Sequence, residues 1–237
     1  MSHLDYYKYQ AVARGIHGPD DVVFQTRANA YLFEQIVGPW LPEDRSAKVV
    51  DLACGHGSFM VWLKQKKYLN ALGIDSCPEQ VKLARAASLN IEEAEVIGWL
   101  ESRPERSFDV LFAIDFIEHI SKDDLMRLLK SSCAALKTDG RLVLRYPNGD
   151  SPFVGLNLFN DITHVWTYTS NCLRTLARMH GFKQVTFADE GRAIRDRKWS
   201  KNALGMVCRL VLKCLIRGAS RERIQYWNSS IWACLEK

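Results

Sequence analysis

The sequence predicts an α/β fold with one mostly parallel sheet of seven strands and helices on both of its faces. Short apolar runs alternate with helical patterns from residue 48 onward, and a glycine-rich turn follows the first run. Repeated strand–helix units of this length form parallel sheets. Right-handed crossovers place the carboxyl ends of the parallel strands at one edge of the sheet. We therefore expect a ligand site at that edge.

Composition and charge exclude several classes of protein. The 237 residues are 47% hydrophobic and 25% charged, which is sufficient for a normal core. Seven cysteines occur without a C-x-x-C pair, a pattern that favours a reducing compartment. The sequence has neither a secretory-signal pattern nor an uncharged apolar run of about 18 residues, so we expect a soluble cytoplasmic protein. Because residues 191–224 carry ten Lys and Arg against two acidic residues, the net charge of +5 comes from this segment, and no general nucleic-acid surface is expected.

The predicted strands and helices follow in order along a single domain, 1–237. An N-terminal helical segment, 1–42, either packs on the core or covers the ligand as a lid, with Tyr6, Tyr7 or Arg27 touching it. The expected helices run to about residue 66, then over 78–89, 98–100, 122–136 and about 170–180. A long loop spans 148–167. The expected strands are 48–52, 70–74, a short one near Ile91, 108–114, 141–146, 182–187 and 230–235.

The first strand leads into a turn that contains Gly55 and Gly57, where a bound ligand can approach the backbone and the amino end of a helix. A dinucleotide fingerprint G-x-G-x-x-G requires a third glycine, but the chain has Met60 there. Asp75 ends the second strand 18 residues after Gly57. A carboxylate at about this distance accepts hydrogen bonds from the two hydroxyls of a ribose, although an acidic helix cap is the simpler alternative.

Four motifs in order resemble those of class I S-adenosylmethionine (SAM) methyltransferases, especially the type 11/23 branch. They are the D-x-x-x-G-x-G turn from Asp51, Glu95-Val96, the run 107–110 (Ser-Phe-Asp-Val), and the run 117–120 (Ile-Glu-His-Ile). The resemblance implies a Rossmann-like fold with an antiparallel last strand, a SAM-binding core at 43–190 and a last strand at 226–237. It also implies SAM as cofactor and S-adenosylhomocysteine as product.

The same resemblance assigns the cofactor contacts. It implies that Asp75 holds the ribose and that Glu95 accepts from the adenine amino group, with Glu92 and Glu93 as competitors for that role. Arg27 is a candidate partner for the cofactor carboxylate. The complete set of implied cofactor contacts is Asp51, Ala53, Gly55, Gly57, Asp75, Ser76, Glu95, Val96, Ile114 and Arg27.

The loop after the fifth strand contains Asp161-x-Thr163-His164, which resembles methyltransferases of bacterial polysaccharide and glycolipid gene clusters. Histidine titrates near neutral pH, so His164 is the candidate base that takes a proton from a hydroxyl, and Asp161 would orient it or substitute for it. Alternatively, both residues brace the loop. The expected acceptor is a hydroxyl or carboxyl of a small molecule, most plausibly a saccharide or a lipid-linked saccharide.

Other functions stay open at this stage. A ubiquinone-type or other small-molecule O- or N-methyltransferase and a non-catalytic SAM-binding regulatory module are both compatible with the motifs. Methylation of nucleic acid or protein is not expected, because residues 115–118 read Asp-Phe-Ile-Glu where an N-P-P-Y-type motif would stand. Glu118 and His119 resemble active-site residues of ubiquinone-type enzymes that sometimes use a divalent metal. The simpler interpretation is that Glu118 caps the following turn and that His119 packs between strand and helix. No metal is predicted.

The basic segment 191–225 reads as a helical insertion before the last strand. Its helix, 202–217, is apolar except for a stripe in which Arg209, Lys213 and Arg217 recur every four residues. The helix is too short and too charged to span a bilayer. It either packs on the domain, packs on a second copy in a homodimer, or lies on an anionic membrane through residues 198–218.

Overall fold

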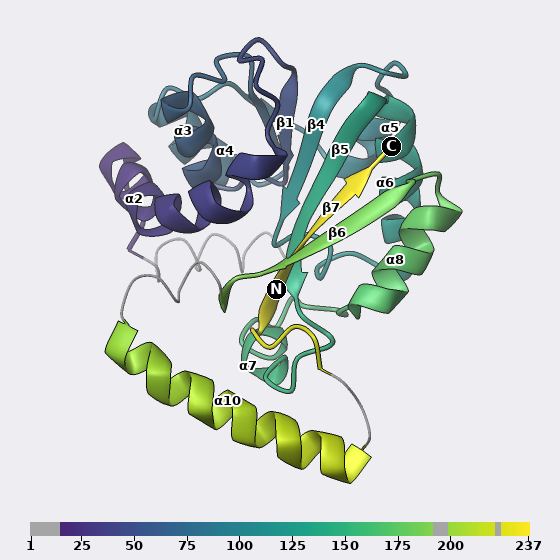
Figure 1. Cartoon of the computed structure of the whole chain (residues 1–237). Coiled ribbons are helices and arrows are strands. Elements are labelled where there is room, and N and C mark those ends of the chain that lie inside the picture. Colours follow the sequence, from purple (N-terminus) through teal and green to yellow (C-terminus); the bar gives the residue numbers. More distant parts are fainter. Residues whose placement is uncertain (1–14, 192–198, 221–223) are drawn as a thin grey trace.

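The computed structural model describes residues 15–191, 199–220 and 224–237, and within them it contains a seven-stranded sheet (Figure 1). The strand order is β3-β2-β1-β4-β5-β7-β6, and β7 is antiparallel to both of its neighbours. The predicted Rossmann-like sheet with an antiparallel last strand is therefore confirmed. The strands are β1 (Val49–Leu52), β2 (Leu72–Asp75), β3 (Ile91–Glu93), β4 (Phe108–Ile114), β5 (Leu136–Pro147), β6 (Gln184–Asp189) and β7 (Ser230–Glu236).

Helices cover the two faces of the sheet in two groups (Figure 1). On one face lie α2 (Pro19–Ile36), α3 (Ser58–Gln65) and α4 (Pro78–Ala86), and on the other lie α5 (Val96–Glu101), α6 (Lys122–Ala135) and α8 (Ser170–Met179). Side chains alternate along the central strands, so Val110 and Phe112 enter one core while Leu111 and Ala113 enter the other. A short 3-10 helix, η1 (Gly38–Trp40), follows α2.

The central strands end in register, which brings their following residues to one edge. Leu52 of β1 pairs with Ile74 of β2 and with Ala113 of β4. The chain then turns sharply after two of these strands, because Ala53 and Asp115 both adopt positive φ angles, 58° and 52°. Such angles are unusual outside glycine and are found at functional sites.

Three elements differ from the expectation. β5 begins five residues before the predicted 141, because Leu136 leaves the helix in an extended conformation and pairs with Phe108. The long loop contains a single helical turn, α7 (Gly155–Leu158), and the helix of the basic insertion, α10 (Trp199–Ser220), extends beyond 202–217 at both ends. Tyr6 and Tyr7 lie outside the described residues.

The chain leaves the sheet at the end of β6, forms the insertion that carries α10, and returns beside the same point before β7. Asp189, the last residue of β6, accepts a hydrogen bond through Oδ2 from the backbone N–H of Trp227 at 2.7 Å. Asn148, just after β5, donates through Nδ2 to the carbonyl oxygen of Asn228 at 2.9 Å. These bonds fasten both ends of the insertion to the carboxyl edge of the sheet. Among the described residues, no helix is sufficiently long and apolar to cross a bilayer.

Candidate active site

A cavity of about 640 Å³ lies at the carboxyl ends of β1, β2 and β4. Its walls come from the turns after these strands, from one face of α2, and from the loop after β5. The predicted site residues that line it are Asp51, Ala53, Gly55, Asp75, Ser76, Glu95, Val96, Ile114, Asp161 and His164. The sheet topology therefore brings residues from distant parts of the chain into one cavity.

The two glycines of the turn have different surroundings: Gly55 lines the cavity, whereas Gly57 is packed against neighbouring side chains. Gly55 has φ +54° and donates its N–H to Asp75 Oδ2 at 2.7 Å, so it links the turns after β1 and β2. Gly57 has φ +88°, and a Cβ built there would lie 2.4 Å from Leu89 Cδ1. It does not appear in the cavity wall. Gly57 is therefore packed tightly at the start of α3.

Two buried carboxylates, Asp51 and Asp75, form the floor of the cavity. Asp75 also accepts the N–H of Cys77 at 2.8 Å, and burial raises its pKa even though these backbone bonds oppose the shift. Burial, with the nearby charge of Asp75, raises the pKa of Asp51 well above its usual value. Asp51 Oδ1 has no hydrogen-bond partner among the described residues. A cationic ligand group would satisfy this oxygen, which fits the ammonium end of an amino-acid-like cofactor.

Glu95 caps the short helix that borders the cavity. Its Oε1 accepts the N–H of Ile97 at 2.9 Å and its Oε2 accepts that of Gly98 at 2.6 Å. A carboxylate has about four lone-pair sites, so these two bonds leave acceptor capacity for a ligand amino group. Val96 is buried beside it. Glu92 and Glu93 do not line the cavity, which leaves Glu95 as the acidic residue placed there by β3 and its following turn.

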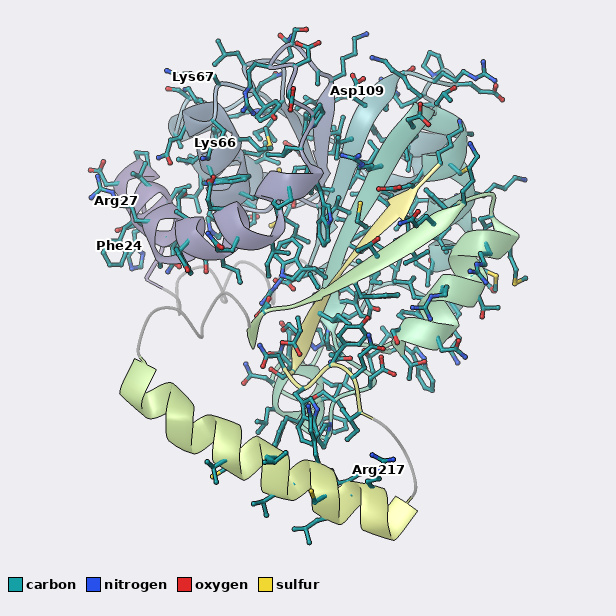
Figure 2. All side chains as sticks on the ribbon, viewed as in Figure 1. Phe24, Arg27, Lys66, Lys67, Asp109 and Arg217 are labelled. Atoms are coloured by element: carbon teal, nitrogen blue, oxygen red, sulfur yellow. The ribbon has the colours of Figure 1, made fainter. Side chains whose placement is uncertain are left out.

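Arg27 is a correction to the sequence prediction. It is exposed and lies, with Phe24, on the outer side of α2 (Figure 2). Gln25 and Asn29 of the same helix line the cavity instead. Consecutive helix residues turn by about 100°, so a position two residues from Gln25 points to the opposite side.

The second half of the cavity is built on Glu118 and the loop after β5. The Glu118 carbonyl accepts the N–H of Val165 at 2.7 Å, which fixes this loop against the turn after β4. The Glu118 side chain is buried, and its Oε2 lacks a partner among the described residues. Burial, with the charge of Asp115, raises its pKa well above the usual value. Its Oε1 lies 3.9 Å from Nε2 of His164.

Hydrogen bonds determine the tautomer of His164. Its Nδ1 lies 3.0 Å from the carbonyl oxygen of Leu158. A carbonyl oxygen only accepts hydrogen bonds, so Nδ1 carries the proton and donates it. In the neutral ring, Nε2 then has a free electron pair and can act as a base or a metal ligand.

His119 has the same tautomer through a different partner. Thr163 donates its hydroxyl to Asp161 Oδ1 at 2.6 Å, and the same oxygen of Thr163 lies 2.9 Å from His119 Nδ1. Nδ1 of His119 is therefore the donor in this contact. Burial, together with the charge of His164, lowers the pKa of His119 to about 4. His119 is neutral at physiological pH, and its ring centroid lies 4.7 Å from that of His164.

Asp161 contacts Thr163 through two hydrogen bonds. It accepts both the N–H and the hydroxyl of Thr163, and through Thr163 it supports His119, whereas Leu158 orients His164. Burial raises the pKa of Asp161, but the bonds from Thr163 outweigh this effect and lower it. Asp161 is therefore an ionised carboxylate that braces the loop.

Several residues of the cavity wall were not predicted as site residues. Glu118 and His119 stood out in a motif, but packing was the favoured interpretation, and the structure brings them to the cavity wall with His164. Together these three form a group that could hold a metal ion, since their ligand atoms lie within 4.8 Å of one another. The length of the loop after β5 was the only signal for Asn157 and Asn160. The remaining unpredicted polar residues are Gln25, Asn29, His56, Ser58, Gln80, Asp115 and Arg145.

Known methyltransferases are similar to this chain in sequence or in fold. A methyltransferase domain family matches residues 24–186. Over 105 residues, the chain is 30% identical to phosphoethanolamine N-methyltransferase from Plasmodium falciparum, a match covering 43% of this chain and 39% of that protein. A SAM-dependent methyltransferase from Archaeoglobus fulgidus has a similar structure, with a TM-score of 0.67 and 20% identity over 91% of this chain and 97% of that one.

A second structural relative was determined with the cofactor present. Phosphoethanolamine N-methyltransferase 2 from Haemonchus contortus, in complex with SAM, superposes with a TM-score of 0.58 and 15% identity over 94% of this chain and 60% of that one. The family match covers more than half of the chain, and the buried carboxylates fit the cofactor. The chain therefore belongs to the class I SAM-dependent methyltransferases.

Proposed function

We propose that this methyltransferase acts on a hydroxyl of a small molecule, a saccharide or lipid-linked saccharide above all, and that His164 is the base. The observation that carries the proposal is the contact between His164 Nδ1 and the Leu158 carbonyl, which leaves Nε2 as a proton acceptor at the cavity wall. A hydroxyl is a weak nucleophile, so removal of its proton during methyl transfer lowers the barrier.

The cofactor half of the cavity determines where the methyl group would lie. SAM supplies a methyl group bound to a positively charged sulfur, which is open to attack by a nucleophile. Asp51 would pair with the ammonium group, Asp75 with the ribose and Glu95 with the adenine amino group. Positioning of two reactants in line accounts for much of the rate enhancement in such displacements.

The acceptor oxygen would approach from the side of the histidines. It would form its bond to the methyl carbon as the bond between that carbon and the sulfur of SAM breaks, with the electron pair remaining on sulfur to leave S-adenosylhomocysteine. The hydroxyl proton would pass to Nε2 of His164 while the Leu158 carbonyl accepts a hydrogen bond from Nδ1–H. The imidazolium that results lies near Glu118, where the buried carboxylate can stabilise a positive charge. His119 stays neutral because of its low pKa, so it does not compete as a base.

The preference for a polyhydroxylated acceptor is supported by amide side chains in the same cavity. Gln25 and Asn29 of α2 and Asn157 and Asn160 of the loop after β5 all line it. Each amide offers both donors and acceptors, which suits vicinal hydroxyl groups. An amine acceptor is the second candidate, favoured by the 105-residue match to a phosphoethanolamine N-methyltransferase.

Labelled SAM with a glycan fraction and a small-amine fraction tests the proposal. We expect SAM to bind in the micromolar range by calorimetry and the label to enter a product stable to nuclease and protease. His164→Ala should retain SAM binding and reduce turnover by about a hundredfold or more. His17→Ala, an exposed histidine outside the cavity wall, is the matched control and should keep full turnover. Full turnover of His164→Ala, or label found only on nitrogen, would overturn the assignment.

A further inference from the structure

One side of α10 presents an apolar surface to solvent. Val207, Val211 and Leu215 follow one another at intervals of four residues, and Leu210 lies beside them. All four are exposed, Val211 to 52% and Leu215 to 65% of the full side chain. Positions four residues apart share a helix face, so these side chains form one continuous stripe, which we call the α10 stripe.

The described cations of α10, Lys213 and Arg217, lie beside the stripe, on the side toward the domain. Lys213 Nζ is 5.6 Å from the ring centroid of Trp227, which places Lys213 on the side that faces the rest of the molecule. Arg217, one turn later, lies on that side as well (Figure 2). Leu212 and Ile216 are only partly exposed, consistent with this orientation. The helix thus turns its apolar side outward, with charges between that side and the domain.

Further exposed apolar residues lie on the loop after β5, at the same end of the molecule as α10. Trp227 contacts Phe153, with ring centroids 6.5 Å apart, so α10 is joined to this loop through Lys213, Trp227 and Phe153. In the loop, Phe159 is 83% exposed and Ile162 is 86% exposed, and Leu156 is also exposed. Both α7, within the loop, and α10 lie at the same end of the molecule (Figure 1). Asn160, Asp161 and His164 of this loop line the cavity.

We propose that the α10 stripe and the exposed loop residues Leu156, Phe159 and Ile162 dock on an anionic lipid bilayer. Charge favours this occupant over a second copy of the chain. Residues 191–224 carry ten Lys and Arg against Asp196 and Glu222, a net +8, which would repel the same segment of another copy. A helix with an apolar side and adjacent cations lies in the headgroup plane, its cations reaching the lipid phosphates.

Docking in this orientation places the cavity mouth beside the lipid surface. The loop that would enter the headgroup region is the loop that carries His164, so an acceptor anchored in the membrane could reach the cavity without leaving the bilayer. This consequence for the acceptor rests on the proposed function. The docking itself does not, and it can be measured without any methyl transfer.

Flotation with lipid vesicles tests the proposal on the full chain. We expect binding to phosphatidylcholine vesicles that contain phosphatidylglycerol, and loss of binding when phosphatidylglycerol is omitted or salt is raised. The double variant Val211→Glu with Leu215→Glu should lose vesicle binding. Arg217→Ala should weaken it by about fivefold, the effect of one cation near an anionic surface. The matched control is Leu69→Glu, an exposed apolar residue before β2, which should bind as the parent does.

Two further measurements make each outcome decisive. SAM binding by calorimetry should be the same in the parent and the stripe variant, which shows that the variant is folded and that a loss of docking is separate from the proposed reaction. Light scattering then tests the alternative occupant of the stripe, a second copy of the chain. The proposal would be overturned if the parent does not bind anionic vesicles. It would also be overturned if the stripe variant turns a dimer into a monomer without changing vesicle binding.

Discussion

Val165 donates its backbone N–H to the carbonyl oxygen of Glu118 at 2.7 Å, and this bond joins the two halves of the histidine site. His119 follows Glu118 in the chain, and His164 precedes Val165. The bond therefore brings together two imidazoles that are 45 positions apart in the sequence. Through this bond, the turn after β4 helps to determine where the loop places His164.

Acidification should destabilise the protein through His119. Its pKa of about 4 in the folded state lies below the usual 6.5, so the unfolded chain binds the proton first. The stabilising effect of the neutral ring is complete above about pH 6.5 and is lost as the pH falls toward 4. We expect the free energy of unfolding to fall by about 2 kcal/mol between about pH 7 and pH 5 from this group. Urea unfolding of parent and His119→Gln should show a smaller decrease in the variant, and equal decreases would contradict the assignment.

Gly57→Ala should reduce stability, whereas Gly55→Ala should reduce SAM binding. At Gly57 the new Cβ meets Leu89 Cδ1 at 2.4 Å and the φ angle is positive, so we expect a loss of about 2–4 kcal/mol. At Gly55 the nearest atom to a Cβ is 3.9 Å away, which leaves mainly the backbone cost of about 1 kcal/mol and an obstruction at the cavity wall. Thermal unfolding and calorimetry with SAM measure the two effects. The same losses in both variants would argue against separate roles.

Asp75→Asn should weaken SAM binding by about tenfold to a hundredfold. The amide preserves size but replaces one acceptor oxygen by a donor, which opposes the N–H of Gly55 or of Cys77. It also removes the charge that a ribose hydroxyl would contact. Calorimetry checks the affinity, with Asp109→Asn as a control because Asp109 pairs with Lys137 away from the cavity. Unchanged affinity in Asp75→Asn would exclude the ribose contact.

Zinc should inhibit the enzyme, and removal of metal should restore it. Imidazole nitrogens and a carboxylate are ligands that Zn²⁺ accepts, so a metal ion held by Glu118, His119 and His164 would remove the proposed base from the reaction. We expect turnover to fall with added Zn²⁺, to recover with a chelator, and to be unaffected by the chelator alone. A rate that disappears with the chelator would mean that the group holds a metal required for activity.

The cofactor half of the site could be predicted because it depends on strand ends. Asp51 and Asp75 stand at the ends of apolar runs and Glu95 follows the short third strand, and parallel topology brings such positions to one edge. Arg27 could not be placed, since its contact depends on which side of α2 meets the core. Val22, Phe33 and Ile36 are buried, and this fixes the rotation of the helix with Arg27 outward. The sequence pattern of the segment did not specify that rotation.

The acceptor half depended on contacts between segments that no local pattern reveals. The tautomers of His119 and His164 are set by the hydroxyl of Thr163 and the carbonyl of Leu158. Leu158 ends a single helical turn inside a long loop, and such short turns form through their surroundings more than through their own residues. Asp161 and His164 could be selected as polar residues in a D-x-T-H run, but their partners required the folded loop.

The bond from Trp227 to Asp189 has a consequence for how this protein could have diversified. Because the chain departs from β6 and returns to β7 at one carboxylate, the length of the intervening segment has little effect on the sheet. A different segment, or a short turn, could stand between the same two residues while the cofactor cavity stayed intact. The cofactor-binding scaffold and the α10 insertion are therefore exchangeable parts, and we expect a chimera that carries another helix at this junction to keep the sheet and the cavity.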